Sequence, residues 1–344
     1  EAAIGNRGWG LRDANFAADW RVAAPTIEWF FEQEIKQLTG TKKAEIDRAL
    51  ESDYTLDGVI AINLAAFLDL LDLTGPIYLP TLKMEVTRNN FQPLIQQYVE
   101  RDYFKNPQNQ QINEPKAILE ELMPLAMVKA ESLSKSALYK LMSSWLENKK
   151  ILIYLNNHSA EQILIDQGWA GALELNADNR ADRPRDFLAV IRSSHGGNKS
   201  SQDIKPIYRY ELVESVGEDL LAKLEINFEH TGTGQWPSGI NHEYIRVLAN
   251  SKAELIKATR LGEDITKEID IGTESQKRAY GFWMHTKPQS SQSISLEYRI
   301  PISAVTETNI FGQDKYQLEL IKQPSGQDAM VEITYVGKKL YNNS

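Results

Sequence analysis

Cysteine is absent from all 344 residues of this chain. A chain without thiols forms no disulfide, holds no metal through thiolate ligands and has no cysteine nucleophile. A cysteine-free chain of this length also favours an extracytoplasmic bacterial protein. The sequence therefore excludes disulfide exchange, zinc sites with cysteine ligands and hydrolases with a cysteine nucleophile.

Long apolar runs and excess positive charge are lacking too. No run approaches the roughly 18 apolar residues that a membrane helix needs. The 38 Lys and Arg residues are outnumbered by 47 Asp and Glu, which gives a formal net charge of −9. Such a balance argues against broad electrostatic binding to nucleic acid or to anionic lipid, although a local basic pocket is compatible with it.

The remaining composition is that of an ordinary globular chain. Hydrophobic residues make up 42% and charged residues 25%, and the length suits two domains better than one. The sequence begins at Glu1 and not at Met. We therefore expect an upstream segment that carries a membrane anchor, and a first domain that is incomplete at its start.

The first half of the chain alternates helix and strand signals. LDGVIAIN, from Leu56 to Asn63, is a short apolar run typical of a buried strand. Asn63 then caps a predicted helix, which Gly75 and Pro76 end. A second buried strand is expected from Lys150. This alternation predicts an α/β domain of three-layer type over residues 1–195.

The second half reads differently. From residue 203 to 344, about eight short segments rich in β-branched and aromatic residues alternate with turn clusters. Strands at this spacing are typical of an antiparallel β-sandwich. The predicted fold class is α+β, with residues 196–202 as the junction between the two domains.

The stretch RSSHGGNKSSQD, from Arg192 to Asp203, contains that junction. A phosphate-binding P-loop needs Gly-Lys-Ser or Gly-Lys-Thr at the opening of a helix, but here Asn198 separates Gly197 from Lys199. We predict a joint between domains, in which Lys199 remains a candidate contact for an anion.

Histidine and loop motifs give few further sites. No two of the five histidines stand four residues apart, so a metal site would require convergence over long range, and none is predicted.

GTGQWPSG lacks the spacing of a dinucleotide fingerprint and is expected to be a hairpin loop. Trp236 in that loop is a candidate for stacking on a sugar. Asp69 and Asp72 are expected to lie on a solvated helix face.

The N-terminal segment carries the main candidate site. Arg12, Asp13, Asn15 and Asp19 fall within a few residues of Trp9 and Trp20. One interpretation is functional, because an arginine fork suits phosphate and an aspartate suits Mg²⁺. The other is structural, with an Arg–Asp pair that fixes a loop to its domain. The residues alone leave both open.

Several motifs resemble an uncharacterised bacterial cell-envelope family, a numbered domain of unknown function. The resemblance depends on LRDANFAADW, LDGVIAINLAAFLDLLDLTGPIYLP, VTRNNF, DQGWAGAL, RDFLAVIRSSHGGNKSSQDI and LELIKQPSG, which follow one another along almost the whole chain. It implies an N-terminal membrane helix, an extracytoplasmic body and a Gly-Gly-Asn-Lys junction between domains.

The first half also resembles, more distantly, the LytR-CpsA-Psr phosphotransferases of bacterial cell walls. That resemblance implies polyprenyl-linked glycopolymer as substrate, with Mg²⁺ and with Arg and Asp residues at the site. Most of those residues lie in segments that do not match this sequence, so the sequence does not decide whether the chain is an enzyme.

Two functional hypotheses follow. In the first, a membrane-anchored cell-envelope protein handles polyprenyl-linked glycopolymer, with Arg12, Asp13, Asn15, Asp19 and Lys199 near the ligand. In the second, a non-catalytic surface module uses its β-sandwich to bind a glycan, through Trp236, or a protein. Both place the chain outside the cytoplasm, anchored by a segment that this sequence does not contain, and neither involves nucleic acid.

Overall fold

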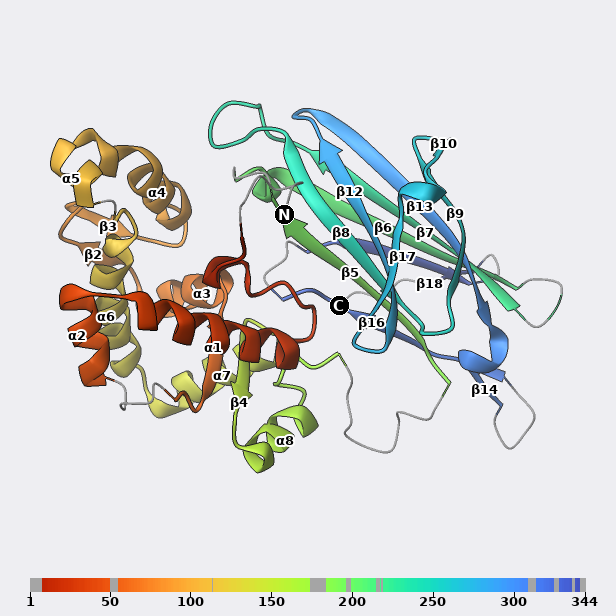
Figure 1. Cartoon of the computed structure of the whole chain (residues 1–344), viewed down its shortest axis with the longest axis horizontal. Helices are drawn as coiled ribbons and strands as arrows, with labels where there is room; N and C mark the ends of the chain where they lie inside the picture. The colour runs from red at the N-terminus through yellow and green to blue at the C-terminus, as the bar shows by residue number, and fades with distance from the viewer. Residues whose placement is uncertain are drawn as a thin grey trace. The chain divides into compact units, whose positions relative to one another are not determined.

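The structure is a computed structural model of the 344-residue chain. It describes residues 8–49, 55–112, 114–173, 184–195, 199–214, 217, 219–308, 314–324, 328–335 and 338–340. These residues form two compact units. Unit 1 contains residues 1–59 and 154–344, and unit 2 contains residues 60–153. The two units are described separately below (Figure 1).

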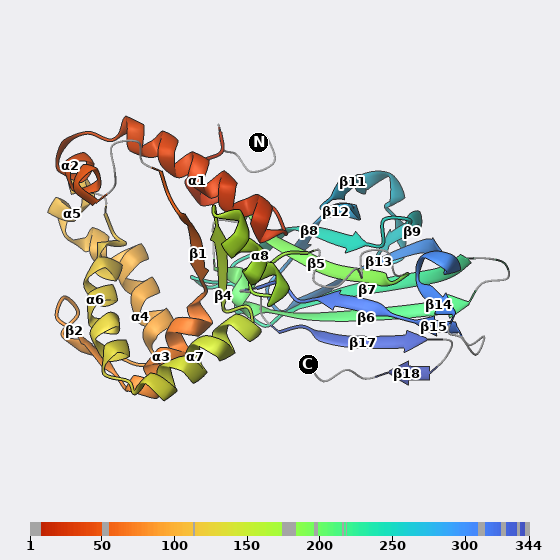
Figure 2. The ribbon, with the colours of Figure 1, turned by 90° about the horizontal axis from the view of Figure 1, so that it is seen from below.

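Two facing β-sheets dominate unit 1 (Figures 1 and 2). The five-stranded sheet has the order β11-β12-β8-β5-β16, and the seven-stranded sheet has the order β10-β9-β13-β7-β6-β17-β18. The strands of the first sheet are β5 (Asp186–Ser194), β8 (Asn241–Ala249), β11 (Asp270–Glu274), β12 (Lys277–Thr286) and β16 (Leu318–Ile321). Those of the second are β6 (Ile204–Glu214), β7 (Asp219–His230), β9 (Glu254–Arg260), β10 (Glu263–Asp264), β13 (Ser290–Pro301), β17 (Met330–Tyr335) and β18 (Lys338–Leu340).

Strict alternation along the strands builds the core between these sheets. In β7, every second residue from Leu220 to His230 is buried, while the residues between them are exposed or half-buried. Period-two burial of this kind places one face of each strand against the opposite sheet. The core includes Leu224, Ile226 and Phe228 from β7 and Ile245 and Val247 from β8.

The sandwich confirms the α+β class and differs in two respects from the expected antiparallel one. β16 pairs with β5 in parallel, and β17 pairs with β6 in parallel. Both are strands from the end of the chain, added beside strands from the start of the sandwich. β5, which the sequence assigned to the first domain, pairs with β8 and belongs to the five-stranded sheet. The compact units thus divide the chain differently from the expected limits at 195 and 203.

The helices of unit 1 are α1 (Trp20–Gln37), α2 (Gly40–Ala49) and α8 (His158–Asp166). Asp19 caps α1, because its Oδ1 accepts from the backbone N–H of Arg21 at 3.0 Å. The Asp19 carboxylate also accepts from the backbone N–H of Leu173 at 3.3 Å. One buried aspartate thereby joins the start of α1 to a segment more than 150 residues further along the chain.

Unit 2 is mostly helical. Its elements are α3 (Leu64–Thr74), α4 (Phe91–Gln97), α5 (Pro107–Ile112), α6 (Ala117–Glu131) and α7 (Lys135–Glu147), with the short hairpin β2 (Ile77–Leu79) and β3 (Met84–Val86). As expected, Asn63 caps α3 by accepting from Ala66 N–H at 3.1 Å. The two expected strands form and pair with each other, as β1 (Gly58–Ile62) and β4 (Ile151–Leu155). The expectation that the first is buried is wrong, because Ile60 and Ile62 are 60% and 59% exposed.

The expectation of a solvated helix face holds for Asp72, whose side chain is 54% exposed, but is wrong for Asp69, whose side chain is 21% exposed. Asp69 accepts from Lys150 Nζ at 2.6 Å and from Trp145 Nε1 at 3.2 Å. Arg88 lies 3.0 Å from Asp72 and 3.6 Å from Asp69. Asp69 therefore joins α3 to α7 and to the residue before β4.

Among the helices that the structure describes, none has both the length and the apolar character needed to cross a bilayer.

Candidate functional site

The outer face of the five-stranded sheet, which points away from the seven-stranded sheet, carries a group of aromatic and histidine side chains. In β8, Glu243, Ile245 and Val247 are buried on the core side. Strand geometry places His242 and Tyr244 on the opposite side. In β12, Phe282 and Met284 face the core, so Trp283 and His285 face outward with them.

One end of this outer face is covered by the N-terminal segment. The backbone N–H of Ala18 donates to Glu274 at 2.8 Å. The guanidinium of Arg246 lies over the Phe16 ring, 3.9 Å from its centroid, and donates to the Phe16 carbonyl. Arg246 also pairs with Glu274 at 2.6 Å. These contacts fix residues 16–18 against β8 and β11.

The other end of the outer face presents a cluster of rings. The Trp283 and His285 rings are nearly parallel, with 5.9 Å between centroids and 9° between planes. Tyr244 packs against Trp283 at 5.3 Å, and His195 meets its edge at 5.4 Å. His242 contacts His285 at 4.8 Å between centroids. We call these five residues, His195, His242, Tyr244, Trp283 and His285, the Trp283 surface.

Hydrogen bonds fix this surface at its margins. The Tyr244 hydroxyl donates to Asp270 of β11 at 2.7 Å. Burial raises the pKa of Tyr244, and that hydrogen bond raises it further, so the hydroxyl stays protonated. The backbone N–H of His285 donates to the side-chain oxygen of Gln292 at 3.1 Å.

Two imidazoles of this surface, those of His195 and His285, have lowered pKa values. Burial lowers the pKa of His195, and the charge of Arg246 lowers it further, while Asp13 opposes both. Burial also lowers the pKa of His285, with added effects from His242 and Arg260. Neutral imidazoles offer one nitrogen as donor and one as acceptor, the combination that suits a polar ligand.

A buried ion pair lies beneath the surface, on the core side of the same strands. Arg192 of β5 donates to Glu243 through Nε at 2.7 Å and through Nη2 at 2.8 Å. Asn241 donates to the same carboxylate at 3.0 Å. The side chains of Arg192 and Glu243 are 9% and 1% exposed. This bidentate pair makes the support of the Trp283 surface rigid.

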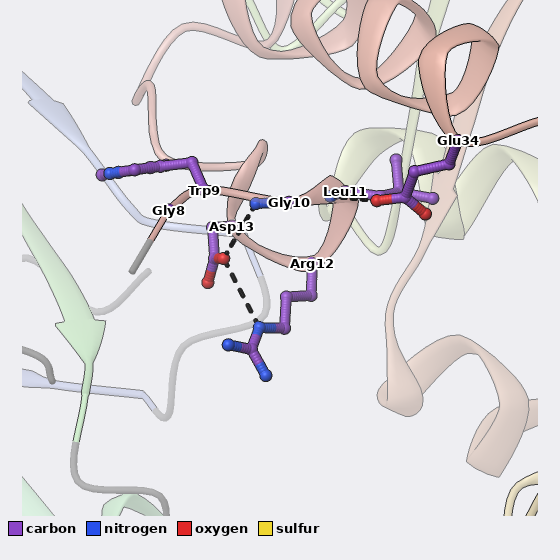
Figure 3. A pocket seen from close by; sticks show the side chains of 7 residues that line it. All are labelled: Gly8, Trp9, Gly10, Leu11, Arg12, Asp13 and Glu34. Atoms are coloured by element: carbon purple, nitrogen blue, oxygen red, sulfur yellow. Dashed lines mark hydrogen bonds and ion pairs between the residues drawn. The ribbon is translucent and has the colours of Figure 1, made fainter. Parts of the chain in front are cut away.

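The N-terminal residues singled out in the sequence line a shallow hollow (Figure 3). It has a volume of about 660 Å³ and is lined by Gly8, Trp9, Gly10, Leu11, Arg12, Asp13 and Glu34. Asp13 accepts from Gly10 N–H at 3.2 Å and from Arg12 Nε at 3.4 Å. The Arg12–Asp13 pair joins two adjacent residues of the same segment, and Arg12 is largely exposed.

The other predicted residues do not converge on that hollow. Asn15 is exposed and Asp19 is 2% exposed, engaged with Arg21 and Leu173 as described. Lys199 is exposed, and its backbone N–H donates to the Pro237 carbonyl at 3.3 Å. That bond brings Lys199 to the loop that carries Trp236, which is 39% exposed. Residues 196–198 of the Gly-Gly-Asn-Lys motif lie outside the described residues.

Sequence reasoning missed the Trp283 surface. Part of this surface could have been predicted from one strand, because the alternation in KRAYGFWMHT places Trp283 and His285 on the face opposite the core residues. The partners come from β8 and from His195, the residue after β5, and His242 is 43 residues from His285. Three of the five histidines, His195, His242 and His285, therefore come together from distant parts of the chain.

Comparisons with known proteins identify no family. No family model matches the chain, and no curated protein matches it. Solved structures that match in part include an M1 zinc metallopeptidase from Deinococcus radiodurans, with 14% identity, 39% of this chain and 32% of that chain covered and a TM-score of 0.24. A second is native leukotriene A4 hydrolase from Saccharomyces cerevisiae, with 10% identity, coverages of 34% and 20% and a TM-score of 0.22. A third is a protein named as nutrient-binding from Legionella pneumophila, with 10% identity, coverages of 43% and 55% and a TM-score of 0.28.

These findings correct two expectations. The chain spans 20% to 55% of the length of those three proteins, and the likeness is too low to transfer an activity or a metal. The envelope family and the LytR-CpsA-Psr resemblance are corrected, because no family model and no curated protein matches the chain. The Mg²⁺ expectation, which depended on that resemblance, is wrong with it. Within the described residues, no three His, Asp or Glu side chains are grouped so as to hold a metal.

Proposed function

We propose that this chain is a binding module whose β-sandwich holds a carbohydrate ligand on the Trp283 surface. The observation that carries the proposal is the pair of nearly parallel rings of Trp283 and His285 on the outer face of β12. Trp283 is half-buried, so its ring is held in place while part of it stays accessible to a ligand. Binding sites typically combine aromatic contact area with a few fixed polar groups.

The polar groups around Trp283 fit the hydroxyls of a sugar. His285 lies nearly parallel to the indole, His195 meets its edge, and His242 contacts His285. Tyr244 and Asp270 form a hydrogen-bonded pair on the neighbouring strands. Imidazoles, a hydroxyl and a carboxylate together supply both donors and acceptors.

The ordered position of these groups supports binding further. β8 and β12 pair without a register shift from Asn241 with Thr286 to Ala249 with Arg278. The buried Arg192–Glu243 pair lies directly beneath. Ring surfaces on paired strands lose little conformational entropy when a ligand binds, which favours affinity.

The proposal includes an extracytoplasmic location and a cell-wall glycan as the first ligand class. Its support for the location is the cysteine-free composition. Trp236, in the loop between β7 and β8, is the alternative residue for stacking on a sugar. An experiment must therefore decide whether the sugar stacks on Trp283 or on Trp236.

Titration with N-acetylglucosamine oligomers and soluble peptidoglycan fragments, followed by tryptophan fluorescence and calorimetry, tests the proposal. We expect Trp283→Ala to weaken binding at least about ten-fold, as for a central aromatic contact. Trp29→Ala, an exposed tryptophan of α1, is the matched control and should bind like the unmodified chain. Loss of binding in Trp236→Ala alone would move the site to the loop. Absence of binding to every glycan of the set would refute the proposal.

A further inference from the structure

Two histidines of the Trp283 surface face each other across neighbouring strands. His242 of β8 and His285 of β12 are direct partners in the antiparallel register. Their Nδ1 atoms lie 2.7 Å apart, and their ring planes meet at 63°. Both side chains point away from the core, His285 being exposed and His242 half-buried. The chain thus presents two imidazole nitrogens to one point above the sheet.

At this distance the two Nδ1 atoms share one proton. One imidazole donates it and the other accepts it, so at least one Nδ1 is unprotonated. The neutral imidazole is the form that binds metal ions.

We propose that His242 and His285 together bind one divalent transition-metal ion, Zn²⁺, Ni²⁺ or Cu²⁺, through their Nδ1 atoms. Imidazole pairs favour these ions over Mg²⁺ or Ca²⁺, which prefer oxygen ligands. Bonds of about 2.0–2.1 Å in tetrahedral geometry separate two ligand nitrogens by about 3.3 Å. Small side-chain rotations bring the two nitrogens from their present separation to that value.

The step requires one proton to change place. The ring that donates its Nδ1 proton must take the other tautomer, with the proton on Nε2, and exchange with water accomplishes this. No net charge leaves the two rings. The metal then replaces a hydrogen bond between the two histidines.

The site leaves coordination positions open. No third His, Asp or Glu joins these two within the part of the chain that the structure describes. Water, or an oxygen of an added ligand, completes the shell, as at metal sites with an open position. This inference goes beyond the carbohydrate proposal and does not depend on it.

Calorimetric titration of tag-free, chelator-treated protein with ZnCl₂ and with NiCl₂ tests the site. We expect one ion per chain, and we expect His242→Gln and His285→Gln each to weaken binding at least about ten-fold. His158→Gln, at the exposed start of α8, is the matched control and should bind like the unmodified chain. Circular dichroism confirms that each variant is folded.

The outcomes separate the two proposals. Trp283→Ala should lose glycan and keep the metal, while His285→Gln should lose the metal. Equal metal binding by the unmodified chain and the His242→Gln/His285→Gln double variant would overturn the metal site. An affinity that falls equally in His158→Gln would mark surface adsorption and would overturn it as well.

Discussion

The hydroxyl of Tyr210 donates a 2.5 Å hydrogen bond to Oδ2 of Asp186 inside the sandwich. Tyr316 donates to the same oxygen at 2.6 Å, and the Phe187 N–H donates to Oδ1 at 2.8 Å. Asp186 and Tyr210 are both almost fully buried. A carboxyl group in such a place affects stability in a way that depends on pH.

Asp186→Asn tests this dependence. Burial raises the pKa of Asp186 above its ordinary value of 3.8, although the hydrogen bonds oppose the shift. The folded chain therefore holds this proton more tightly than the unfolded chain. The contribution of Asp186 to the free energy of unfolding is present at low pH and is lost as pH rises through the folded pKa.

The asparagine variant has no such loss. We expect the difference in free energy of unfolding, variant minus unmodified chain, to rise with pH above about 4, by up to about 1.4 kcal/mol per pH unit. Urea unfolding at a series of pH values measures it. A difference that stays constant from pH 4 to pH 8 would contradict a raised pKa.

Glu243→Ala tests the ion pair beneath the Trp283 surface. The change leaves the guanidinium of Arg192 buried without its carboxylate, which costs about 3–5 kcal/mol for a buried pair. Arg192→Met with Glu243→Leu should recover a large part of that loss, because no unpaired charge then remains. Glu254→Ala, from an exposed pair with Arg299, serves as control and should change the unfolding midpoint little.

Asp69→Ala tests the polar contacts of unit 2. The variant loses the acceptor of Lys150 and of Trp145 Nε1, and we expect a loss of about 1–3 kcal/mol. Asp72→Ala is the matched control on the same helix, since Asp72 is 54% exposed and forms an ion pair with the half-exposed Arg88. Its effect should stay within about 1 kcal/mol. Equal losses in both variants would show that Asp69 acts only as a surface charge.

Local sequence patterns predicted where helices and strands form better than they predicted which strands pair with each other. The helix from Asn63 to Gly75 and the alternation of β7 were readable because capping and period-two burial are properties of one segment. The sheet to which β5 belongs could not be predicted from its sequence. Its neighbours β8 and β16 lie far along the chain, and nothing within Asp186–Ser194 encodes which strands it pairs with.

The same limit applies to the site. Arg12, Asp13, Asn15 and Asp19 were chosen because they are close in sequence, yet the structure gives Asp13 and Asp19 separate local partners. The Trp283 surface takes its residues from β8, from β12 and from the residue after β5, and its assembly depends on the register between these strands. Register over such separations is set by packing of the whole core.

Asp19→Ala provides the last test, because it separates the structural interpretation of the N-terminal cluster from the ligand-binding one. The variant loses the cap of α1 and the acceptor of the Leu173 N–H and of the Arg21 guanidinium. Loss of a cap alone costs about 0.5–2 kcal/mol, and the further buried bonds bring the expected loss to at least about 2 kcal/mol.

Glycan binding, unlike stability, should not change in this variant. Asp19 is not part of the Trp283 surface, so folded Asp19→Ala should bind N-acetylglucosamine oligomers like the unmodified chain, while Trp283→Ala should not. Asp19→Asn retains an oxygen that caps the helix and should recover much of the stability. If Asp19→Ala lost glycan binding while its unfolding midpoint stayed unchanged, the carboxylate would be a ligand contact, and its assignment as the cap that joins α1 to Leu173 would be wrong.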